Sequence, residues 1–363
     1  MRFGIPAELC KFKGNYFLDA VEHLSRGVAS LDARGLGFRQ GYNMKLVTFH
    51  TGDGQPRTGA LNVAEDAVFD LAAEDAQPFF ATMLALIEAG HSAVARAGEI
   101  VAAGAGEIPL ADVCFMTPVP EPPQLRDFLC FEEHLINGYN MLRKKKAEAE
   151  PDPEEALVRF EREGVFAIPP IWYEQPVYYK PSRFGIIGTD QDVAWPKFSE
   201  MLDYEMEFGA WVGTKCKDVS PEEAKGVIFG FSIFNDISAR DTQAMEMSAG
   251  LGPGKGKDFE TGNIIGPCIV TADGFDPYNA DMIVRINGEE RSRGNSGDMH
   301  WKFEDCIAHA SRSETIYPGE FFCSGTVPWG CGLEHDLYLS DGDVVELEVT
   351  GIGVLRNRVV RKH

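Results

Sequence analysis

One alternating stretch, LDYEMEFGAWVG at 202–213, constrains the fold of this chain more than any other feature. Successive side chains of a β-strand point to opposite faces, so one face of this segment would carry only apolar and aromatic side chains. The other face begins with three carboxylates, Asp203, Glu205 and Glu207. A helix is disfavoured, because it would place Asp203 and Glu207 one turn apart as like charges. The segment therefore predicts a strand with one face on the core.

The three acids have two interpretations. Antiparallel strands commonly leave one face in water, which produces the same alternation without any function. Alternatively, carboxylate oxygens that converge on one point form the kind of site that Mg²⁺ and Ca²⁺ prefer. The choice depends on whether acids elsewhere in the chain can join these three.

The proline-rich segment MTPVPEPPQ at 116–124 is the clearest boundary in the chain. Before it, residues 44–120 alternate and turn like a small β-unit, with a helical pattern over 78–104. After it, residues 121–363 contain further alternating segments and Asn-Gly and Asp-Gly turns, with little βαβ repetition. We therefore predict an α+β, mainly β fold, with a small N-terminal β domain, a larger second domain, and a leader of uncertain role over 1–43.

Charge and composition exclude several classes of partner. The formal net charge is −22 over 363 residues, which disfavours binding to nucleic acid or to an anionic membrane. No apolar run approaches the length of a membrane span, and no signal-peptide block opens the chain. The eight cysteines form no C-x-x-C pair, so we expect reduced, mostly buried thiols. A cytoplasmic protein with no nucleic-acid or membrane partner is the prediction.

A charged segment interrupted by prolines, RKKKAEAEPDPEEALVRFEREG, lies at 143–164. Such a composition is typical of a solvated helical excursion from the body of a domain. A mobile lid over a site is the alternative interpretation.

An acid and a histidine, Asp127 and His134, lie seven residues apart in RDFLCFEEHLINGYN at 126–140. If the segment is a helix, two turns separate them and both lie on one side. A lone histidine near an acid is more often structural than catalytic, so this pair by itself identifies no chemistry.

Three further segments combine charge with small residues. FNDISARDTQ at 234–243 follows an apolar run, and is either a surfacing helix end or the floor of a polar site. GLGPGKGKDF at 250–259 lacks the spacing of a phosphate-binding loop, but it can bring Lys257 to an anionic substrate. FFCSGTVPWGCGLE at 321–334 is either a tight loop or a place where backbone approaches a ligand closely. The motifs of zinc proteases, serine hydrolases and NAD enzymes are missing.

These segments, taken in order, resemble the fumarylacetoacetate hydrolase family over roughly 125–355. The resemblance rests on RDFLCFEEH, LDYEMEF, FNDISARDTQ, LGPGKGKDF and SGTVPWGCGLE. It implies a mixed β-sandwich roll, usually a homodimer, that holds Mg²⁺, Mn²⁺ or Ca²⁺. Asp203 is left out of the implied metal ligands, which are Asp127, Glu205, Glu207 and Asp236.

The same resemblance implies roles for further residues. The catalytic histidine would be His134, with Glu334 as its acid partner and Lys257 also in the catalytic set. The substrate-binding residues would be Arg240, Gln243 and Thr326. The implied reaction is hydrolysis of a C–C bond in an acylpyruvate or fumarylacetoacetate-like 1,3-diketo acid, through an enolate that the divalent ion stabilises. The alternatives are a decarboxylase, or an isomerase or hydratase, of 2-oxo acids of the oxaloacetate or 2-hydroxy-diene-dioate type, and a non-catalytic binding protein.

Two positions depart from the family pattern. The hydrolase that names the family has a tyrosine where this chain has Leu129. Family acylpyruvases and oxaloacetate decarboxylases have a glutamate three residues after the histidine, where this chain has Asn137. The name-giving hydrolase also has asparagine there, which favours water attack and hence hydrolysis.

Overall fold

The computed structural model of this chain describes residues 44–361. The leader predicted for 1–43 lies outside the described residues. Within the described range, no helix combines the length and the apolar character that a membrane crossing requires.

One large sheet runs through most of the molecule and has 12 strands within the described residues. Its strands are β1 (Lys45–His50), β2 (Arg57–Leu61), β3 (Ala67–Asp70), β4 (Glu107–Pro109), β5 (Cys114–Phe115), β6 (Leu125–Phe128), β7 (Tyr178–Tyr179), β8 (Ile186–Ile187), β11 (Met206–Val212), β12 (Ile228–Asp236), β14 (Asn263–Thr271) and β17 (Phe321–Cys323). The order is β4-β3-β2-β1-β14-β12-β11-β17-β6-β7, with β5 beside β1 and β8 beside β14.

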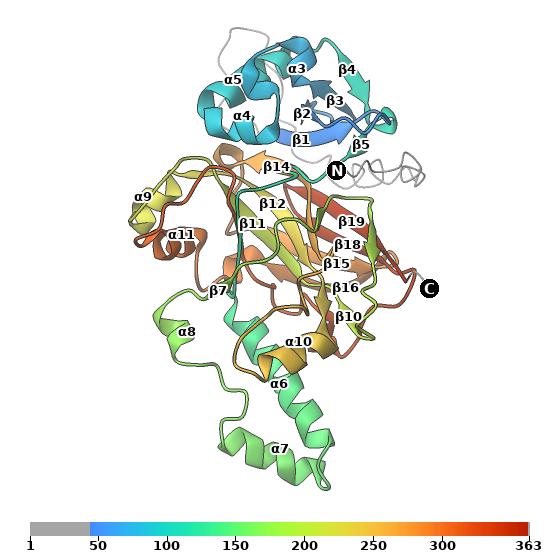
Figure 1. Cartoon of the computed structure of the whole chain (residues 1–363), viewed down its shortest axis with the longest axis vertical. Helices are drawn as coiled ribbons and strands as arrows, with labels where there is room; N and C mark the ends of the chain where they lie inside the picture. The colour runs from blue at the N-terminus through green and yellow to red at the C-terminus, as the bar shows by residue number, and fades with distance from the viewer. Residues whose placement is uncertain (1–43, 362–363) are drawn as a thin grey trace.

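A second, five-stranded sheet packs against the centre of the first, as Figure 1 shows. Its order is β16 (Glu289–Asn295), β15 (Asp281–Ile286), β18 (Val344–Val349), β19 (Gly353–Val360) and β9 (Asp192–Ala194). The buried core between the two sheets includes Phe208, Phe231, Val284 and Leu347. A short pair, β10 (Leu202–Asp203) and β13 (Ser238–Ala239), lies beside them. The predicted α+β, mainly β sandwich is confirmed.

The N-terminal unit continues the large sheet, because β1 pairs with β14 through Lys45↔Val270 and Leu46↔Ile269. β1 and β2 form an antiparallel hairpin. The helical pattern over 78–104 is divided by Gly90, whose φ of +63° ends one helix and begins the next. The helices of the N-terminal unit are α3 (Leu71–Glu74), α4 (Met83–Ala89) and α5 (His91–Ala103), with a 3-10 turn at Pro78–Phe80. The separation of 44–120 from 121–363 as domains stays a prediction.

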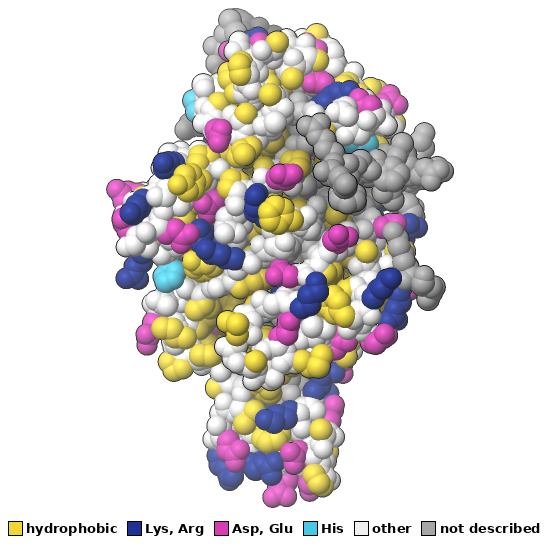
Figure 2. Space-filling view, viewed as in Figure 1, with side chains coloured by type: hydrophobic (Ala, Val, Ile, Leu, Met, Phe, Trp, Pro, Cys, Tyr) yellow, Lys and Arg dark blue, Asp and Glu magenta, His cyan; other side chains and the backbone are white. Residues whose placement is uncertain are grey.

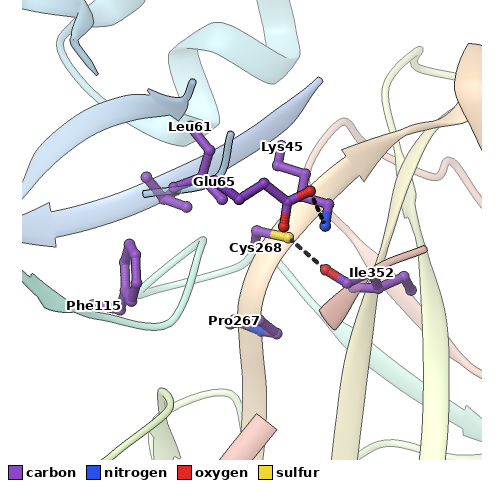
Figure 3. A pocket seen from close by; sticks show the side chains of 8 residues that line it. Lys45, Leu61, Glu65, Phe115, Pro267, Cys268 and Ile352 are labelled. Atoms are coloured by element: carbon purple, nitrogen blue, oxygen red, sulfur yellow. Dashed lines mark hydrogen bonds and ion pairs between the residues drawn. The ribbon is translucent and has the colours of Figure 1, made fainter. Parts of the chain in front are cut away.

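A small hollow lies where this unit joins the rest, beside β14 (Figure 3). Lys45 and Glu65 form an ion pair of 2.6 Å at its rim, and Cys268 donates to the carbonyl of Ile352 at 3.4 Å. The side chains that line it are Lys45, Val47, Leu61, Glu65, Phe115, Pro267, Cys268 and Ile352. None of the predicted site residues is among them.

Two helices, α6 (Glu132–Glu148) and α7 (Pro153–Arg162), project from the far end of the molecule in Figure 1. Ala147, Ala156 and Phe160 pack together between them. Figure 2 shows both signs of charge on the surface of this projection. The helical excursion predicted at 143–164 is confirmed, while its function as a lid stays a prediction.

The remaining helices are short and cap the sheets. Ser220 begins α9 with a capping box, since its hydroxyl accepts from the N–H of Glu223 and the Glu223 carboxylate accepts from the N–H of Ser220. The helices are α8 (Ile171–Glu174), α9 (Pro221–Lys225), α10 (Arg240–Met247), α11 (Phe303–Ser311) and α12 (Gly332–His335), with 3-10 turns at Leu110–Asp112, Ala272–Gly274 and Ser296–Asp298.

The stretch 202–213 is a strand, but its acids do not face water. It is divided into β10 and β11, and β11 lies inside the large sheet between β12 and β17. Asp203, Glu205 and Glu207 are all buried. The water-facing interpretation is therefore wrong, because neighbouring elements cover both faces of this strand.

Within residues 44–361, the cysteines follow the expectation with one exception. Cys130, Cys216, Cys268, Cys306, Cys323 and Cys331 are free and buried. Cys114 is disulfide-bonded, so the prediction of reduced thiols is wrong at that position.

Candidate active site

Four predicted metal ligands lie at neighbouring positions on the large sheet. Glu205 immediately precedes β11, Glu207 lies on it, and Asp236 ends the adjacent β12. One carboxylate oxygen from each of these three lies within 4.8 Å of the others. Asp127 lies on β6 and forms a second such group with Glu207 and the sulfur of Cys323. The shared residue, Glu207, joins the two groups into one acidic cluster, which comprises Asp127, Glu205, Glu207 and Asp236.

Asp127 and His134 do not share a helix, so the condition under which both would lie on one side of it is not met. Asp127 pairs with Tyr179 in the β6–β7 ladder, whereas His134 lies in the first turn of α6. The difference arises because Leu125–Phe128 pairs in parallel with β17 and is drawn into the sheet.

Two buried cations contact the acidic cluster. Nζ of Lys257 lies 2.5 Å from Oε2 of Glu205 and also contacts Oδ2 of Asp236. Nη2 of Arg240 lies 2.7 Å from Oε1 of Glu205, and Nη1 donates to Oε1 of Gln243 at 3.0 Å. The structure thus brings the predicted residues Lys257 and Arg240 into contact with the cluster. Gln243 is linked to the cluster indirectly, by its hydrogen bond from Arg240.

Asp203 belongs to a different contact set, although it shares the alternation of Glu205 and Glu207. Its carboxylate accepts from Nε of Arg240 at 2.8 Å and from the backbone N–H groups of Gly332 and Leu333 at 2.7 and 2.9 Å. These bonds attach the first turn of α12 to the sheet. Asp203 therefore positions backbone.

Burial and neighbouring charges shift the pKa values of the clustered acids in opposite directions. Burial raises the pKa of Glu205, but the charges of Lys257 and Arg240 outweigh it and lower the pKa to about 2. Burial, together with the charge of Asp127, raises the pKa of Glu207 well above its usual range. Burial and the charge of Asp236 likewise raise the pKa of Asp127. Lys257 and Arg240 therefore do not neutralise all four carboxyl groups of the cluster.

The donor set fits a hard divalent cation. Oδ1 of Asp127 and Oδ1 of Asp236 are buried without a hydrogen-bond partner, although buried polar atoms normally have one. Other oxygens of the cluster are oriented: the Tyr179 hydroxyl donates to Oδ2 of Asp236 at 2.6 Å, and the Gly325 N–H donates to Oε2 of Glu207 at 3.0 Å. Free carboxylate oxygens at several converging positions are the ligands that Mg²⁺, Mn²⁺ and Ca²⁺ take.

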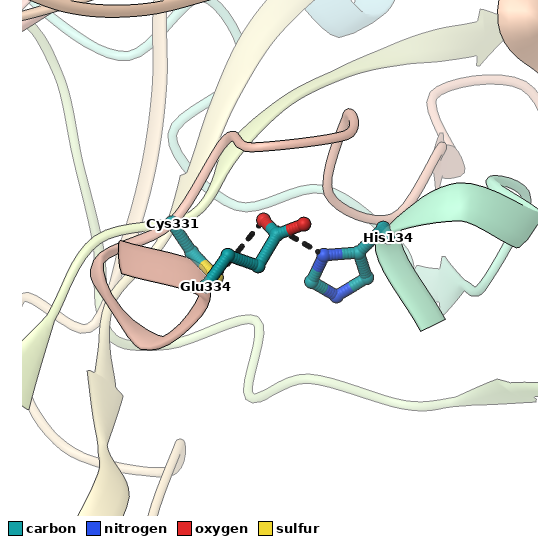
Figure 4. Close-up of side chains that lie close together, drawn as sticks. All are labelled: His134, Cys331 and Glu334. Carbon is teal, nitrogen blue, oxygen red and sulfur yellow. Dashed lines mark hydrogen bonds and ion pairs between the residues drawn. The ribbon is translucent and has the colours of Figure 1, made fainter. Parts of the chain in front are cut away.

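His134 and Glu334 face each other next to this cluster, from α6 and α12 (Figure 4). Nδ1 of His134 lies 3.1 Å from Oε2 of Glu334. Burial raises the pKa of Glu334, but the charge of His134 and its hydrogen bonds outweigh burial and hold this pKa below its usual range. A carboxylate at Nδ1 fixes the proton on that nitrogen and leaves Nε2 free to accept one.

The pair is held by backbone and side-chain donors. Oε1 of Glu334 accepts from the N–H of Trp329 at 2.9 Å and from Nδ2 of Asn137 at 3.2 Å. The Cys331 thiol lies 3.4 Å from Oε2, and the backbone of Cys331 bridges to that of Glu205. This bridge places the His134–Glu334 pair beside the acidic cluster.

Sequence reasoning did not identify two residues of this site, Tyr179 and Trp329. Tyr179 was missed, although its position opposite Asp127 follows once β7 is paired with β6. Trp329 was missed because its contact with Glu334 is made through the backbone. Thr326, which the family resemblance implies as a substrate-binding residue, is buried next to Gly325, whose N–H donates to Glu207.

Known proteins provide the comparison for this site. The family model described as fumarylacetoacetate (FAA) hydrolase C-terminal matches residues 152–360. Human mitochondrial oxaloacetate tautomerase FAHD2A is 30% identical over 286 residues, which cover 77% of this chain and 80% of that protein.

Solved structures share the fold. Fumarylacetoacetate hydrolase from Exiguobacterium antarcticum superposes with a TM-score of 0.66 at 25% identity, covering 88% of this chain and 100% of the other. Maleylpyruvate hydrolase from Sphingobium sp. SYK-6, solved with manganese(II) and pyruvate, has a TM-score of 0.64 at 24% identity, with 88% and 100% covered. The matches in sequence and in fold agree, and this chain belongs to the fumarylacetoacetate hydrolase family, whose members include hydrolases, isomerases and tautomerases.

Proposed function

We propose that this protein is a divalent-metal-dependent hydrolase that cleaves a C–C bond in an acylpyruvate-like 1,3-diketo acid. The observation that carries the proposal is the His134–Glu334 contact of 3.1 Å beside the acidic cluster. A histidine oriented by a buried carboxylate is a general base suited to activating water near neutral pH. Asn137 supports the same reaction, because it holds Glu334 in place through Oε1.

Asp127, Glu205, Glu207 and Asp236 would hold Mg²⁺, or Mn²⁺ or Ca²⁺ in its place. When bound, such an ion supplies Lewis-acid polarisation of the substrate's carbonyl oxygens. The unpartnered oxygens of Asp127 and Asp236 support this ligand set. The manganese in the maleylpyruvate hydrolase structure supports a divalent ion in the family.

The protein residues then divide the proton transfers between them. Nε2 of His134 takes a proton from water, and the oxygen of that water attacks the carbonyl carbon distal to the carboxylate. Glu334 stabilises the imidazolium that forms. The C–C bond breaks, its electron pair stays with the 2-oxo acid fragment, and a proton returns to that carbon. The products are a carboxylic acid and a 2-oxo acid such as pyruvate, so one water is consumed for each bond cleaved.

Lys257, Arg240, Gln243 and Thr326 would bind the substrate. An ammonium and a guanidinium can neutralise the 2-oxo acid carboxylate and the charge that develops on oxygen. Both cations already lie at the acidic cluster, within reach of a ligand that binds there.

A second candidate is an isomerase or tautomerase of 2-oxo acids at the same site. The observation that favours it is the 30% identity to a protein named as an oxaloacetate tautomerase. In that reaction His134 would remove a proton from the carbon next to the carbonyl and return it elsewhere, without consuming water. A decarboxylase would use the same residues and release CO₂.

A substrate panel separates these reactions. Acylpyruvates, oxaloacetate and oxo-dienoates are incubated with the protein and Mg²⁺ or Mn²⁺, and products are identified by mass spectrometry in H₂O and D₂O. Hydrolysis yields two fragments that together contain one added water, decarboxylation loses CO₂, and isomerisation changes only deuterium content. We expect cleavage of an acylpyruvate, and loss of this activity in His134→Ala. Turnover of oxaloacetate alone, with deuterium exchange and no cleavage of any acylpyruvate, would instead establish the second candidate.

A homodimer in the cytoplasm, acting on a small-molecule diketo or 2-oxo acid, completes the proposal. The family resemblance supports the homodimer, and the net charge of −22 supports a partner other than nucleic acid. Light scattering of the purified protein measures the first point.

A further inference from the structure

Trp329 has a backbone conformation that tryptophan rarely adopts. Its φ is +63°, in the left-handed region where a side chain normally clashes with the backbone. Glycine adopts this conformation without such a clash. Strained positions of this kind persist where the side chain serves a function. The indole of Trp329 therefore needs an explanation beyond the turn in which it lies.

The hydrogen bonds of the backbone do not explain the side chain. The N–H of Trp329 donates to Oε1 of Glu334, and its carbonyl lies 3.0 Å from Nε2 of His335. A glycine at this position would offer the same N–H and the same carbonyl. What glycine would lack is the indole, whose Nε1 donates to Oε1 of Glu133 at 3.3 Å.

The contact with Glu133 places the indole beside the general base. Glu133 immediately precedes His134 in the first turn of α6. Trp329 keeps 41% of its surface exposed, so part of the ring is open to a ligand. The ring thus lies where the distal part of a substrate would extend if its reacting carbonyl were near His134.

The ring of Trp329 lies against the imidazole of His335, with 5.4 Å between the ring centroids. Glu133 adds a carboxylate at the edge of the indole. Nearby cations have carboxylate partners: Lys145 contacts Asp336, and Arg240 contacts Asp203 and Glu205. A negatively charged distal group would meet repulsion here, whereas an uncharged one would gain apolar contact.

We propose that Trp329 is a specificity-determining residue that forms an uncharged wall beside His134. The substrate class is then a 2-oxo acid with a single carboxylate and an uncharged aliphatic or aromatic distal group. This inference rests on the proposed function in one respect only, that the substrate binds between His134 and the acidic cluster.

Two 2-oxo acids that differ at the distal end test the inference without turnover. Binding of 2-oxohexanoate and of 2-oxoglutarate to the full chain with Mg²⁺ is measured by isothermal titration calorimetry. Neither is a 1,3-diketo acid, so failure of the proposed hydrolysis would not affect this measurement. We expect the wild type to bind 2-oxohexanoate at least about tenfold more tightly than 2-oxoglutarate, the size of discrimination that an apolar pocket provides.

Two variants of Trp329 separate a role in binding from a role in folding. Trp329→Gly should bring the ratio of the two affinities close to one while the melting temperature stays level or rises, because glycine relieves the left-handed strain. Trp329→Phe keeps an apolar ring and should keep most of the preference. A merely structural tryptophan would give the opposite pattern for the glycine variant, a lower melting temperature with an unchanged ratio.

A third variant keeps the test decisive if Trp329→Gly fails to fold. Glu133→Gln removes the negative charge at the edge of the indole, and should tighten 2-oxoglutarate binding roughly threefold with little effect on 2-oxohexanoate. Equal affinities in the wild type, tighter binding of 2-oxoglutarate, binding of neither acid, or no response of 2-oxoglutarate to Glu133→Gln would overturn the inference.

Discussion

The acidic cluster and the His134–Glu334 pair lie side by side but are built in different ways. The cluster projects from β6, β11 and β12, strands inside a large sheet, and its four carboxylates are buried. The pair projects from α6, which continues outward to α7, and from α12, a helix of four residues. The sheet fixes the cluster through its ladder, whereas individual side-chain contacts fix the pair.

The difference in construction implies a difference in what substitutions do. Removing one partner of a buried ion pair leaves an uncompensated charge and destabilises the fold. Removing His134 leaves the Glu334 carboxylate with its hydrogen bonds from Trp329 and Asn137, so this carboxylate is not left without partners. The cluster should therefore link stability to ion binding, while the pair should affect catalysis with little effect on stability.

The largest expected effect is on catalysis, in His134→Ala. Loss of a general base lowers kcat by about 10²–10⁴-fold. The melting temperature should change less than kcat, because Oε1 of Glu334 keeps its hydrogen bonds from Trp329 and Asn137 when the histidine is removed. Steady-state kinetics and thermal unfolding are measured on the same samples, with His91→Ala, on the exposed start of α5, as the control. A large drop in melting temperature with unchanged kcat would reverse the comparison.

The next effect is on stability, in Lys257→Met. The change removes the ammonium that contacts Glu205 and Asp236, and should cost about 3–5 kcal/mol in the free energy of unfolding of metal-free protein. Mg²⁺ or Mn²⁺ should restore much of this loss, since the ion replaces the missing charge. Urea unfolding with and without chelator measures both quantities.

Lys255→Met in the same loop is the matched control for Lys257. Lys255 is exposed, and its Nζ donates to the carbonyl of Asp258. We expect little change in its free energy of unfolding. Equal losses in the two variants would mean that Lys257 does not neutralise the cluster.

A smaller effect is the pH dependence of ion binding. The pKa values of Asp127 and Glu207 are raised by burial and neighbouring acids, so these groups hold protons that an ion must displace. Affinity for Mn²⁺ should therefore rise with pH, and binding should release protons. In metal-free protein, the stability that these two groups contribute is fully present below their unfolded pKa values. It is lost as pH rises through their folded values.

Calorimetry in two buffers of different ionisation enthalpy counts the released protons. Glu207→Gln should release fewer of them. If the wild type released no protons, Asp127 and Glu207 would already be ionised before the ion binds. That result would contradict the raised pKa values of these two groups.

The smallest effect concerns the capping box of α9, which touches neither region. Ser220→Ala removes the hydroxyl that accepts from Glu223 and should cost about 1 kcal/mol of stability. The value of kcat should be unchanged. Chemical unfolding and kinetics on this variant show how a loss of stability alone affects activity, which calibrates the other comparisons.

Much of the fold was predictable, because alternation and turn residues report strands directly. The segment 202–213 was predicted as a strand, and it forms β10 and β11. The burial of the acids on this strand was harder to predict, because alternation shows which residues share a face and not which elements cover that face. The spacing of Asp127 from His134 left a shared helix open, and the strand at Asp127 could not be predicted because it depends on pairing with a distant strand.

The candidate site was predictable as a set of residues and less so as a set of contacts. Asp203, Glu205 and Glu207 look alike in the alternating pattern, yet Asp203 bonds to Arg240 and the backbone of α12. The contacts of Lys257 join elements far apart in the chain. The backbone strain at Trp329 depends on a three-dimensional loop that no local pattern specifies.

The most direct test is titration of Mn²⁺ into metal-stripped protein by isothermal calorimetry, comparing the wild type with Asp236→Asn. If Asp127, Glu205, Glu207 and Asp236 form a cation site, the wild type will bind one ion per chain with saturation. Asp236→Asn will bind it at least about tenfold more weakly, because a charged ligand oxygen is lost. Thermal unfolding of each sample checks that the variant is folded. Equal binding by the two proteins, or no saturable binding by the wild type, would contradict the assignment of the acidic cluster as a metal site.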